Sequence, residues 1–396
     1  MSTPRIVVVG AGHAGFHTAL FLRSVRWAGE VVLVDGQTGL PYQRPPLSKE
    51  FLAGKQELDD GHFRPQSFYR SQDIQLVGGV RVDAIDADAR ELQLDGGPTI
   101  EYDELVLATG SRPRVLPIPG SQLGGVLTLA TATDAATLRS RLAGAEHLVV
   151  LGGGFIGLET AAIAVTAGKQ VTVFEAADRL MARAVTEPMS RYFERVHRSQ
   201  GVEIVLSSAV TAIEGDRTGV RAVVTADGRQ HRADLVVMGV GSVPNDTLAA
   251  EAGIAVDHGI VVDPELRTSV AHISAIGDCA RFRTRYAIDQ PTVRLESVQN
   301  ATDQGRFLAG RIAGAGGKAF DAVPWFWTEQ LGRKLQIAGL TSGADRIEQV
   351  ETGADHFSVF CYRGDALIGC ESVNAPRDHM RARKELAQAH SAMAGS

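Results

Sequence analysis

The hydrophobic pattern of the chain is a series of short apolar runs, separated by longer segments of mixed character. Each run has the length and the composition of one buried strand. Two of the runs, 5–9 and 148–151, are each followed by a glycine-rich loop and then by an apolar segment that predicts a helix. Strands that alternate with helices are typical of parallel α/β sheets. The runs of this kind lie at 5–9, 31–34, 105–108, 148–151, 171–174, 235–238 and 273–276.

The last part of the chain, from about Phe320, has a different pattern. A predicted helix at 299–312 and a glycine-rich turn at 313–317 separate it from what comes before. Short apolar runs then alternate with turns, and this favours a small antiparallel sheet with a helix. The predicted elements are strands at 335–339, 357–362 and 366–369 and a charged helix near 381–389.

The first glycine loop has the spacing of a dinucleotide fingerprint. Gly10 permits a tight turn, Gly12 lets the backbone approach a pyrophosphate, and Gly15 lets the helix pack closely on the strand. The start of the helix offers free N–H groups to phosphates. About twenty residues after the last glycine, the next apolar run ends in Asp35, whose carboxylate can accept hydrogen bonds from a ribose.

The fingerprint occurs a second time. Gly152, Gly154 and Gly157 follow the run at 148–151, and the next apolar run ends in Glu175. Two fingerprints, each between a predicted strand and a predicted helix, indicate two dinucleotide-binding folds. The chain is therefore expected to bind two dinucleotides.

The order of the motifs predicts that the second fold interrupts the first. The first dinucleotide-binding domain is expected at 1–112 and 246–319, and the second at 113–245. A C-terminal α+β domain is expected at 320–396. The fold class is thus α/β, with two Rossmann-like domains and one small appended domain.

Composition narrows the class of protein further. A chain of 396 residues that is 44% hydrophobic is long enough for two or three ordinary cores. A net charge of −6 gives no overall attraction to nucleic acid or to an anionic membrane. The first strand begins almost at once, and no apolar stretch is long enough for a membrane span, so a cytoplasmic protein is expected. Three scattered cysteines have no metal-binding spacing, and we expect neither a disulfide scaffold nor a metal. Each is expected to be a small core residue.

Nearly the whole chain resembles the FAD-dependent NADH:ferredoxin reductases of bacterial oxygenase systems, a group of glutathione-reductase-like flavoproteins. The stretches at 296–301 and 324–327 are fairly specific to this group, and the others are shared more widely. The matching stretches are Gly10–Gly15, Arg44–Lys49, Ala108–Pro113, Gly152–Glu159, Ile276–Phe282, Glu296–Ala301 and Pro324–Trp327.

The resemblance implies FAD in the first fold and NADH in the second. It also implies that Lys49 lies beside the flavin and pairs with Glu159, that Asp278 binds the ribityl chain and that Trp327 lies at the flavin ring. These three, Lys49, Glu159 and Trp327, are the catalytic candidates. From the residues alone, Lys49 could equally be a solvated lysine, Glu159 an acid in the first turn of a helix, and Trp327 a core residue.

Further cofactor contacts follow from the resemblance. The carboxylate of Glu175 would bind the ribose of NADH and repel the extra phosphate of NADPH. Ala130 stands where relatives often have an arginine near FAD, which removes one expected contact. The full set expected to contact the two cofactors is Gly10, Gly12, His13, Ala14, Gly15, Asp35, Arg44, Lys49, Val82, Ala108, Thr109, Gly110, Gly152, Gly154, Ile156, Gly157, Glu175, Arg183, Gly241, Asp278, Val298 and Trp327.

The expected reaction is hydride transfer from NADH to FAD, followed by single-electron transfer to a two-iron two-sulfur ferredoxin. No cysteine lies between Leu40 and Lys49, where disulfide reductases keep a redox-active thiol. The alternatives are another acceptor, such as a rubredoxin or a quinone, or a redox interaction protein like apoptosis-inducing factor. Either a monomer or a homodimer is compatible with the sequence. The ferredoxin would contact a basic patch, for which the candidates are Arg281, Arg283, Arg285, Arg306 and Arg311.

Overall fold

The computed structural model describes residues 3–290, 292–315, 317 and 319–391. They form two compact units, between which the chain passes repeatedly. Each unit contains one parallel sheet, so the predicted α/β class is confirmed. Unit 1 comprises the residues up to Gln43, Gly61–Arg112 and Val243–Phe326, and unit 2 comprises Arg44–Asp60, Pro113–Ser242 and the residues from Trp327 onward.

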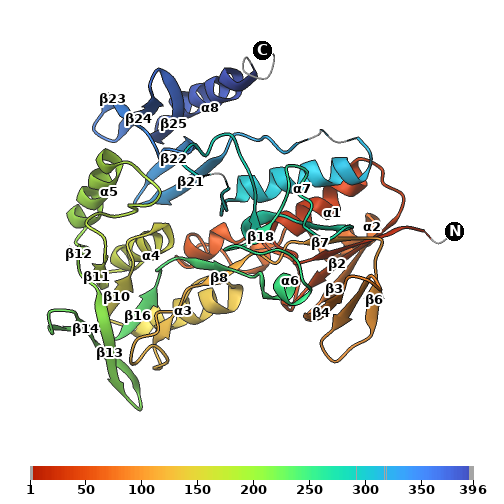
Figure 1. Cartoon of the computed structure of the whole chain (residues 1–396). Helices are drawn as coiled ribbons and strands as arrows, with labels where there is room; N and C mark the ends of the chain where they lie inside the picture. The colour runs from red at the N-terminus through yellow and green to blue at the C-terminus, as the bar shows by residue number, and fades with distance from the viewer. Residues whose placement is uncertain (1–2, 291, 316, 318, 392–396) are drawn as a thin grey trace. The chain divides into compact units, whose positions relative to one another are not determined.

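Unit 1 is built on a five-stranded parallel sheet in the order β19-β7-β1-β2-β3. Its central strands are continuous apolar runs that are buried on both faces, as expected for a parallel sheet. Helices α1 and α7 pack against each other, and Figure 1 shows them side by side. The elements are β1 (Arg5–Val9), α1 (His13–Ser24), β2 (Glu30–Asp35), β3 (Ile74–Gly78), β7 (Glu104–Leu107), β19 (Ile273–Ala275) and α7 (Val298–Ile312).

Smaller elements surround this sheet. Strands β4, β5 and β6 form an antiparallel three-stranded sheet, and β18 pairs with β20 in parallel. The chain passes between the units within β8 and β17. The bounds are η2 (Asp59–Gly61), α2 (Gln66–Ser71), β4 (Val82–Asp86), β5 (Glu91–Leu94), β6 (Thr99–Glu101), β8 (Ser111–Pro113), β17 (Ser242–Pro244), α6 (Thr247–Glu251), β18 (Ile260–Val261), η3 (Gly277–Cys279) and β20 (Ala280–Arg281).

Unit 2 repeats the pattern with a parallel sheet in the order β12-β11-β10-β16-β9. A three-stranded antiparallel sheet, β13-β14-β15, accompanies it. The elements are η1 (Pro45–Ser48), β9 (Val126–Leu127), α3 (Ala132–Gly144), β10 (His147–Leu151), α4 (Phe155–Thr166), β11 (Gln170–Phe174), α5 (Glu187–Ser199), β12 (Glu203–Val205), β13 (Val210–Asp216), β14 (Gly219–Thr225), β15 (Gln230–Arg232) and β16 (Leu235–Met238).

The C-terminal part contributes a second five-stranded sheet, in the order β21-β22-β25-β24-β23, with α8 packed on β25 and β22. The predicted antiparallel sheet with a helix is therefore confirmed. From Trp327 onward this sheet belongs to unit 2, and the three-domain division from the sequence stays a prediction. The bounds are β21 (Trp325–Gln330), β22 (Arg333–Gly339), β23 (Arg346–Gly353), β24 (His356–Arg363), β25 (Ala366–Val373) and α8 (Pro376–Ser391).

Sequence and structure differ mainly in short or exposed elements. Two prolines at 45 and 46 predict the first turn of a helix that runs on through Lys49, but the structure has one short 3-10 helix that ends at Ser48. Strand β23 was not expected, because all of its side chains are exposed and no buried alternation marks it. The predicted turn at 313–317 contains residue 316, which lies outside the described residues.

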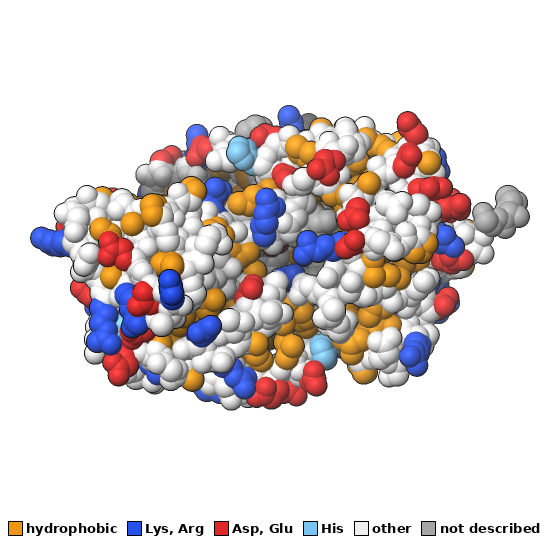
Figure 2. Space-filling view, turned by 90° about the horizontal axis from the view of Figure 1, so that it is seen from below, with side chains coloured by type: hydrophobic (Ala, Val, Ile, Leu, Met, Phe, Trp, Pro, Cys, Tyr) orange, Lys and Arg blue, Asp and Glu red, His pale blue; other side chains and the backbone are white. Residues whose placement is uncertain are grey.

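The face drawn in Figure 2 shows no single dominant charge. Figure 2 shows basic and acidic side chains interspersed over the face in view. Among the residues that the structure describes, no helix is long and apolar enough to cross a membrane.

Candidate cofactor-binding and redox site

The first glycine loop follows β1 at the carboxyl edge of the unit 1 sheet. Gly10 has φ +103°, and a Cβ on it would lie 2.3 Å from the carbonyl oxygen of Ala108. A Cβ on Gly15 would lie 1.8 Å from the carbonyl oxygen of Gly10. Gly12 is the N-cap of α1 and makes no side-chain cap bond, so the first N–H groups of the helix remain available to a ligand. His13 and Ala14 form the first turn of this helix.

Other predicted residues of unit 1 gather at the same edge. Asp35 ends β2, Ala108–Gly110 follows β7, and Asp278 follows β19. Since these strands are parallel neighbours, their carboxyl ends meet at one edge, where ligands bind in open α/β sheets. The hydroxyl of Ser111 donates to Oδ2 of Asp278 over 3.4 Å. Val298 begins α7.

Asn245 is a residue of this edge that the sequence analysis missed. Its Nδ2 donates to the carbonyl oxygen of Thr109 over 2.9 Å, and the hydroxyl of Thr109 donates back to the carbonyl oxygen of Asn245 over 2.7 Å. This exchange fixes the turn at Thr109 and Gly110. Its only signal in the sequence is the position of Asn245 after a strand and a proline.

The second glycine loop, in unit 2, has the same construction. A Cβ on Gly152, which has φ +99°, would lie 2.5 Å from the carbonyl oxygen of Gly239. A Cβ on Gly157 would lie 2.3 Å from the carbonyl oxygen of Gly152. Gly154 is the N-cap of α4 and makes no side-chain cap bond. Both loops therefore have the shape and the free N–H groups that fit the pyrophosphate of a dinucleotide.

Besides its predicted contact with the ribose of NADH, Glu175 accepts hydrogen bonds from two backbone N–H groups. Its Oε2 accepts a hydrogen bond from the backbone N–H of Gly153 at 2.7 Å, and Oε1 accepts one from Ala177 at 2.8 Å. Each oxygen keeps further acceptor capacity for a ribose hydroxyl. Arg183 and Gly241 come together, since a Cβ on Gly241 would lie 3.2 Å from Nη2 of Arg183. Ile156 is exposed in the first turn of α4.

The predicted pair of Lys49 and Glu159 is also brought together within unit 2. Nζ of Lys49 lies 2.7 Å from Oε1 of Glu159, and the Glu159 side chain is only 3% exposed. Two hydroxyls complete the surroundings of this carboxylate. Ser48 donates to Oε2 over 2.5 Å, and Thr328 donates to Oε1 over 2.6 Å.

Ser48 and Thr328 were missed by sequence reasoning. Their signal is their position in the chain, because each lies next to a catalytic candidate, Lys49 or Trp327. Side chains alternate along a strand, so Thr328 and Trp327 lie on opposite faces of β21. Thr328 is fully buried and Trp327 is only partly buried. Trp327 therefore keeps some surface for a partner.

Arg44 caps η1 and turns towards Ala130. Its Nη1 donates to the carbonyl oxygen of Ala130 over 2.5 Å. A cation thus lies beside Ala130 although the residue itself has none. Val82 begins β4 in unit 1, next to Arg81, whose side chain lies against Gly36 just after Asp35.

The arginines proposed as a patch have different surroundings, all within unit 1. Arg283 is exposed, and Arg285 pairs with Asp321. Arg281 pairs with Asp257 at 3.6 Å. Arg306 lies over the ring of Phe21 at 4.8 Å. Arg311 is turned inward, and its Nη1 and Nη2 donate to the carbonyl oxygen of Glu265 and the hydroxyl of Ser274.

The three cysteines are free and buried, as predicted for small core residues. Burial raises the pKa of all three thiols, in the case of Cys370 to about 12. A neutral buried thiol is a poor nucleophile. Thiol chemistry at these positions is therefore disfavoured.

Each unit has a glycine loop that fits a dinucleotide at the carboxyl edge of its parallel sheet. Two such sites in one chain are typical of an oxidoreductase that uses two dinucleotides. The sequence pattern of the pyridine nucleotide-disulphide oxidoreductase family matches residues 4–305, and that of the reductase C-terminal family matches residues 325–395. The chain belongs to the pyridine nucleotide-disulphide oxidoreductases.

Individual relatives are similar over almost their whole length. Rhodocoxin reductase of Rhodococcus erythropolis is 48% identical over 96% of this chain and 89% of its own. Putidaredoxin reductase CamA of Pseudomonas putida is 41% identical over 94% of this chain and 89% of its own. The crystal structure of the ferredoxin reductase for the CYP199A2 system of Rhodopseudomonas palustris superposes with a TM-score of 0.93 at 45% identity, covering 96% of this chain and 93% of that one.

Proposed function

We propose that this chain is an FAD-dependent NADH:ferredoxin reductase of a bacterial oxygenase system. The observation that carries the proposal is the pair of dinucleotide-binding edges in a chain that is 48% identical to a rhodocoxin reductase. When bound, FAD accepts a hydride from NADH and releases the electrons singly to a two-iron two-sulfur ferredoxin. The chain itself supplies binding, orientation and charge.

The two glycine loops bind the pyrophosphates, and the acids at the end of β2 and directly after β11 bind the riboses. Asp35 serves FAD in unit 1, and Glu175 serves NADH in unit 2. The carboxylate of Glu175 disfavours NADPH, because the added 2′-phosphate would meet a negative charge. Arg183, exposed beside Gly241, is assigned to the adenine of NADH.

Lys49 and Glu159 are assigned to the reacting flavin, with Trp327 as the aromatic at its ring. The ammonium of Lys49 would stabilise negative charge on the reduced ring system. Glu159 holds that ammonium in one place through the 2.7 Å ion pair, and the hydroxyls of Ser48 and Thr328 hold Glu159. Hydride transfer itself requires no protein nucleophile.

For the ferredoxin we propose a contact that uses the outward-facing arginines of the predicted patch. The support is exposure, since Arg283 and Arg306 are both exposed, the latter with its guanidinium over the ring of Phe21. Arg281 and Arg285 are each held by one acid, and Arg311 is the weakest member because its guanidinium is turned inward. The putidaredoxin reductase–putidaredoxin complex, which superposes with a TM-score of 0.92 at 38% identity over 98% of this chain and 93% of that one, supports a small iron–sulfur protein as partner.

A rubredoxin is the second candidate acceptor. Rubredoxin-NAD(+) reductase of Pseudomonas putida is 37% identical over 94% of this chain and 96% of its own. The fold and the cofactor edges would be the same for either acceptor, so only the acceptor surface distinguishes the two functions.

The test measures both halves of the reaction. Anaerobic mixing of the FAD-loaded protein with NADH should bleach the flavin absorbance, and a flavin that stays oxidised would refute the hydride step. Cytochrome c reduction by NADH is then measured with two-iron two-sulfur ferredoxins or rubredoxins added one at a time. Stimulation by a ferredoxin supports the proposal, whereas stimulation only by a rubredoxin replaces it with the second candidate.

A further inference from the structure

A buried carboxylate of the C-terminal sheet is bonded to the start of helix α5 in unit 2. Glu371 lies in the middle of β25, opposite Ile337 of β22 and Val359 of β24, and is 0% exposed. Its Oε1 accepts a hydrogen bond from the backbone N–H of Thr186 at 2.8 Å. Its Oε2 accepts one from the hydroxyl of Thr186 at 2.6 Å.

Thr186 is the N-cap residue of α5, and the geometry of this cap is unusual. A threonine at this position normally accepts a hydrogen bond from the helix with its hydroxyl. Here the side chain accepts no such bond, and the hydroxyl donates to Glu371. Negative charge is favourable at the start of a helix, so the carboxylate replaces the missing cap.

The segment that ends at Thr186 is the one that connects β11 with α5, here called loop 176–186. It contains Arg183, and it is braced by Arg179, which donates to the carbonyl oxygens of Ala182 at 2.7 Å and Val185 at 2.8 Å. The backbone N–H of Met181 donates to the carbonyl oxygen of Gly153 in the second glycine loop, at 2.9 Å. The loop is thus tied to the glycine loop in its middle.

We infer that Glu371 is a positioning residue for the pyridine nucleotide. From its place in the C-terminal sheet, Glu371 holds the end of loop 176–186 that leads into α5. The inference rests on the proposed function. Glu175 fixes the beginning of the loop through Ala177, and Glu371 fixes its end through Thr186. Between these two anchors lies Arg183, the residue assigned to the adenine.

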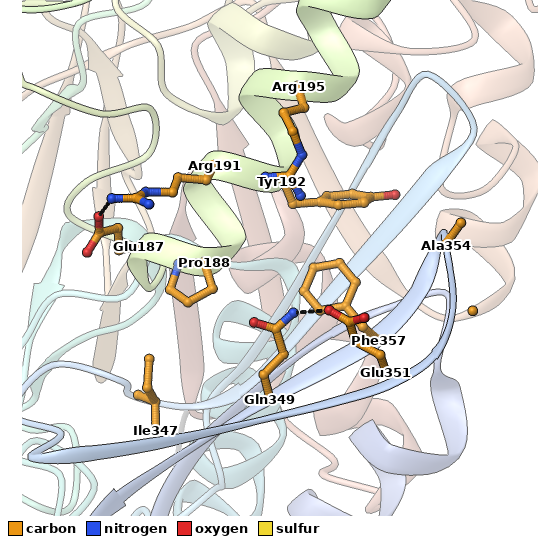
Figure 3. Close-up of a pocket in the computed structure, with 11 residues that line it drawn as sticks. Glu187, Pro188, Arg191, Tyr192, Arg195, Ile347, Gln349, Glu351, Ala354 and Phe357 are labelled. Carbon is orange, nitrogen blue, oxygen red and sulfur yellow. Dashed lines mark hydrogen bonds and ion pairs between the residues drawn. The ribbon is translucent and has the colours of Figure 1, made fainter.

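A cavity beside the first turn of α5 makes the hydrogen bonds between Glu371 and Thr186 important for the position of this helix. About 790 Å³ of space lies between α5 and strand β23, and Figure 3 shows Pro188 facing Gln349 across it, while Arg191 turns towards Glu187. Further along α5, the hydroxyl of Tyr192 donates to Oδ1 of Asp355 at 2.7 Å. The first turn of α5 faces the cavity, so Glu371 supplies a direct attachment to the sheet where close packing is interrupted.

Protonation of Glu371 would weaken this anchor. Burial raises its pKa to about 7, although the hydroxyls of Thr186 and Thr341, the N–H of Thr186 and the charge of Arg179 all oppose the rise. A protonated carboxyl cannot accept from all of these donors at once, because one oxygen becomes a donor. The thiols of Cys361 and Cys370 near Glu371 stay neutral in this range, because burial raises the pKa of both.

The experiment compares the wild-type chain with Glu371→Gln, which keeps the size of the side chain and removes the charge. The dissociation constant of NAD⁺ is measured by calorimetry on the FAD-loaded protein between about pH 6 and about pH 8. For the wild type it should rise about threefold to tenfold as the pH falls, because the ionised anchor is lost. For Glu371→Gln it should be high at every pH.

Two controls separate positioning from general damage. Glu348→Gln removes an exposed carboxylate from β23 of the same sheet and should leave the pH profile of NAD⁺ binding unchanged. The limiting rate of anaerobic flavin bleaching by saturating NADH should stay within about twofold of the wild type in Glu371→Gln, because the anchor acts on binding. If Glu371→Gln fails to fold, Thr186→Val, which removes one donor, should raise the dissociation constant in the same direction.

The inference is overturned if Glu371→Gln or Thr186→Val binds NAD⁺ with the wild-type affinity and pH profile. Failure of the proposed function has a different signature. In that case the wild type itself would bind no NAD⁺, or would bind it and leave the flavin oxidised in the presence of NADH.

Discussion

Nζ of Lys49 lies 2.7 Å from Oε1 of Glu159, a carboxylate that is almost completely buried. Two residues separated by more than a hundred positions thus form one charged unit. The hydroxyls of Ser48 and Thr328 also donate to the carboxylate. A buried ion pair of this kind is costly to break from one side, because the remaining charge is left without a counter-ion.

Lys49→Ala is therefore expected to lower the free energy of unfolding by about 3 kcal/mol. Adding Glu159→Gln to this variant should restore part of the loss, since a neutral amide replaces the orphaned charge. Urea denaturation measures both values. Lys169→Ala is the control, because the Lys169 ammonium makes an exposed hydrogen bond to the carbonyl oxygen of Ala143. An equal loss in the control would contradict the assignment.

Glu175→Ser should shift the enzyme away from NADH. The ratio of kcat/KM for NADH to that for NADPH is expected to fall about tenfold, because the negative charge that meets the 2′-phosphate is gone. Activity with NADH should also drop, since Gly153 loses its acceptor. Asp178→Ser, an exposed acid of the same loop, should leave the ratio unchanged. A preference that does not move in Glu175→Ser would refute the assignment.

Gly10→Ala is expected to yield a protein with little FAD. The new methyl group would lie 2.3 Å from the carbonyl oxygen of Ala108, and the left-handed backbone at φ +103° disfavours alanine. The loop must therefore move away from the pyrophosphate. Flavin content per chain, read from the absorbance ratio, measures the effect. Gly144→Ala is the matched control, because it has open space around it at the end of α3 and should keep full flavin content.

Arg283→Glu should slow electron transfer to a ferredoxin and leave ferricyanide reduction unchanged. The exposed charge acts on the encounter with an acidic partner, so the difference between wild type and variant should shrink as salt screens it. Steady-state turnover at increasing salt provides the measurement. Arg217→Glu, at the exposed turn between β13 and β14, serves as the control. If both variants slow the ferredoxin reaction equally, net charge rather than this surface is responsible.

Because of Glu371, the free energy of unfolding of the wild type should fall as the pH rises, whereas its affinity for NAD⁺ should increase. Burial raises the pKa of this carboxyl from its usual 4.5 to about 7 in the folded chain. The folded state therefore holds a proton that the unfolded state has lost, and this stabilisation disappears as the pH rises through about 7. Relative to Glu371→Gln, the wild type should lose up to about 3 kcal/mol of unfolding free energy between about pH 4.5 and about pH 7. A constant difference across this range would exclude ionisation of the buried carboxyl.

Much of the fold could be predicted from the sequence because its signals are local. The strands β1 and β10 are apolar runs that lead into glycine loops, and both requirements are visible within a few residues. Strand β23 could not be predicted, since its stability comes from pairing with β24 and none of its side chains is buried.

Site residues could be predicted from the sequence where a local motif marks them. They could not be predicted where the contact is between residues that lie far apart in the chain. Gly10, Gly152, Asp35 and Glu175 follow from spacing alone. Glu371 does not, because a carboxylate inside a strand is normally expected on the solvent face. Only the tertiary structure shows that Thr186, far away in the chain, supplies its hydrogen-bond donors.

The strand order of unit 1 has a consequence for synthesis of the chain. Strand β19 pairs with β7, with Ile273 opposite Leu105. The part of the chain between these two strands contains all the strands of the parallel sheet of unit 2. While the ribosome makes that stretch, β7 has one open edge that offers unpaired N–H and C=O groups. Until residue 273 emerges, this edge can pair with strands of other polypeptides. A chaperone that covers exposed strands would therefore raise the yield of this protein in a foreign host.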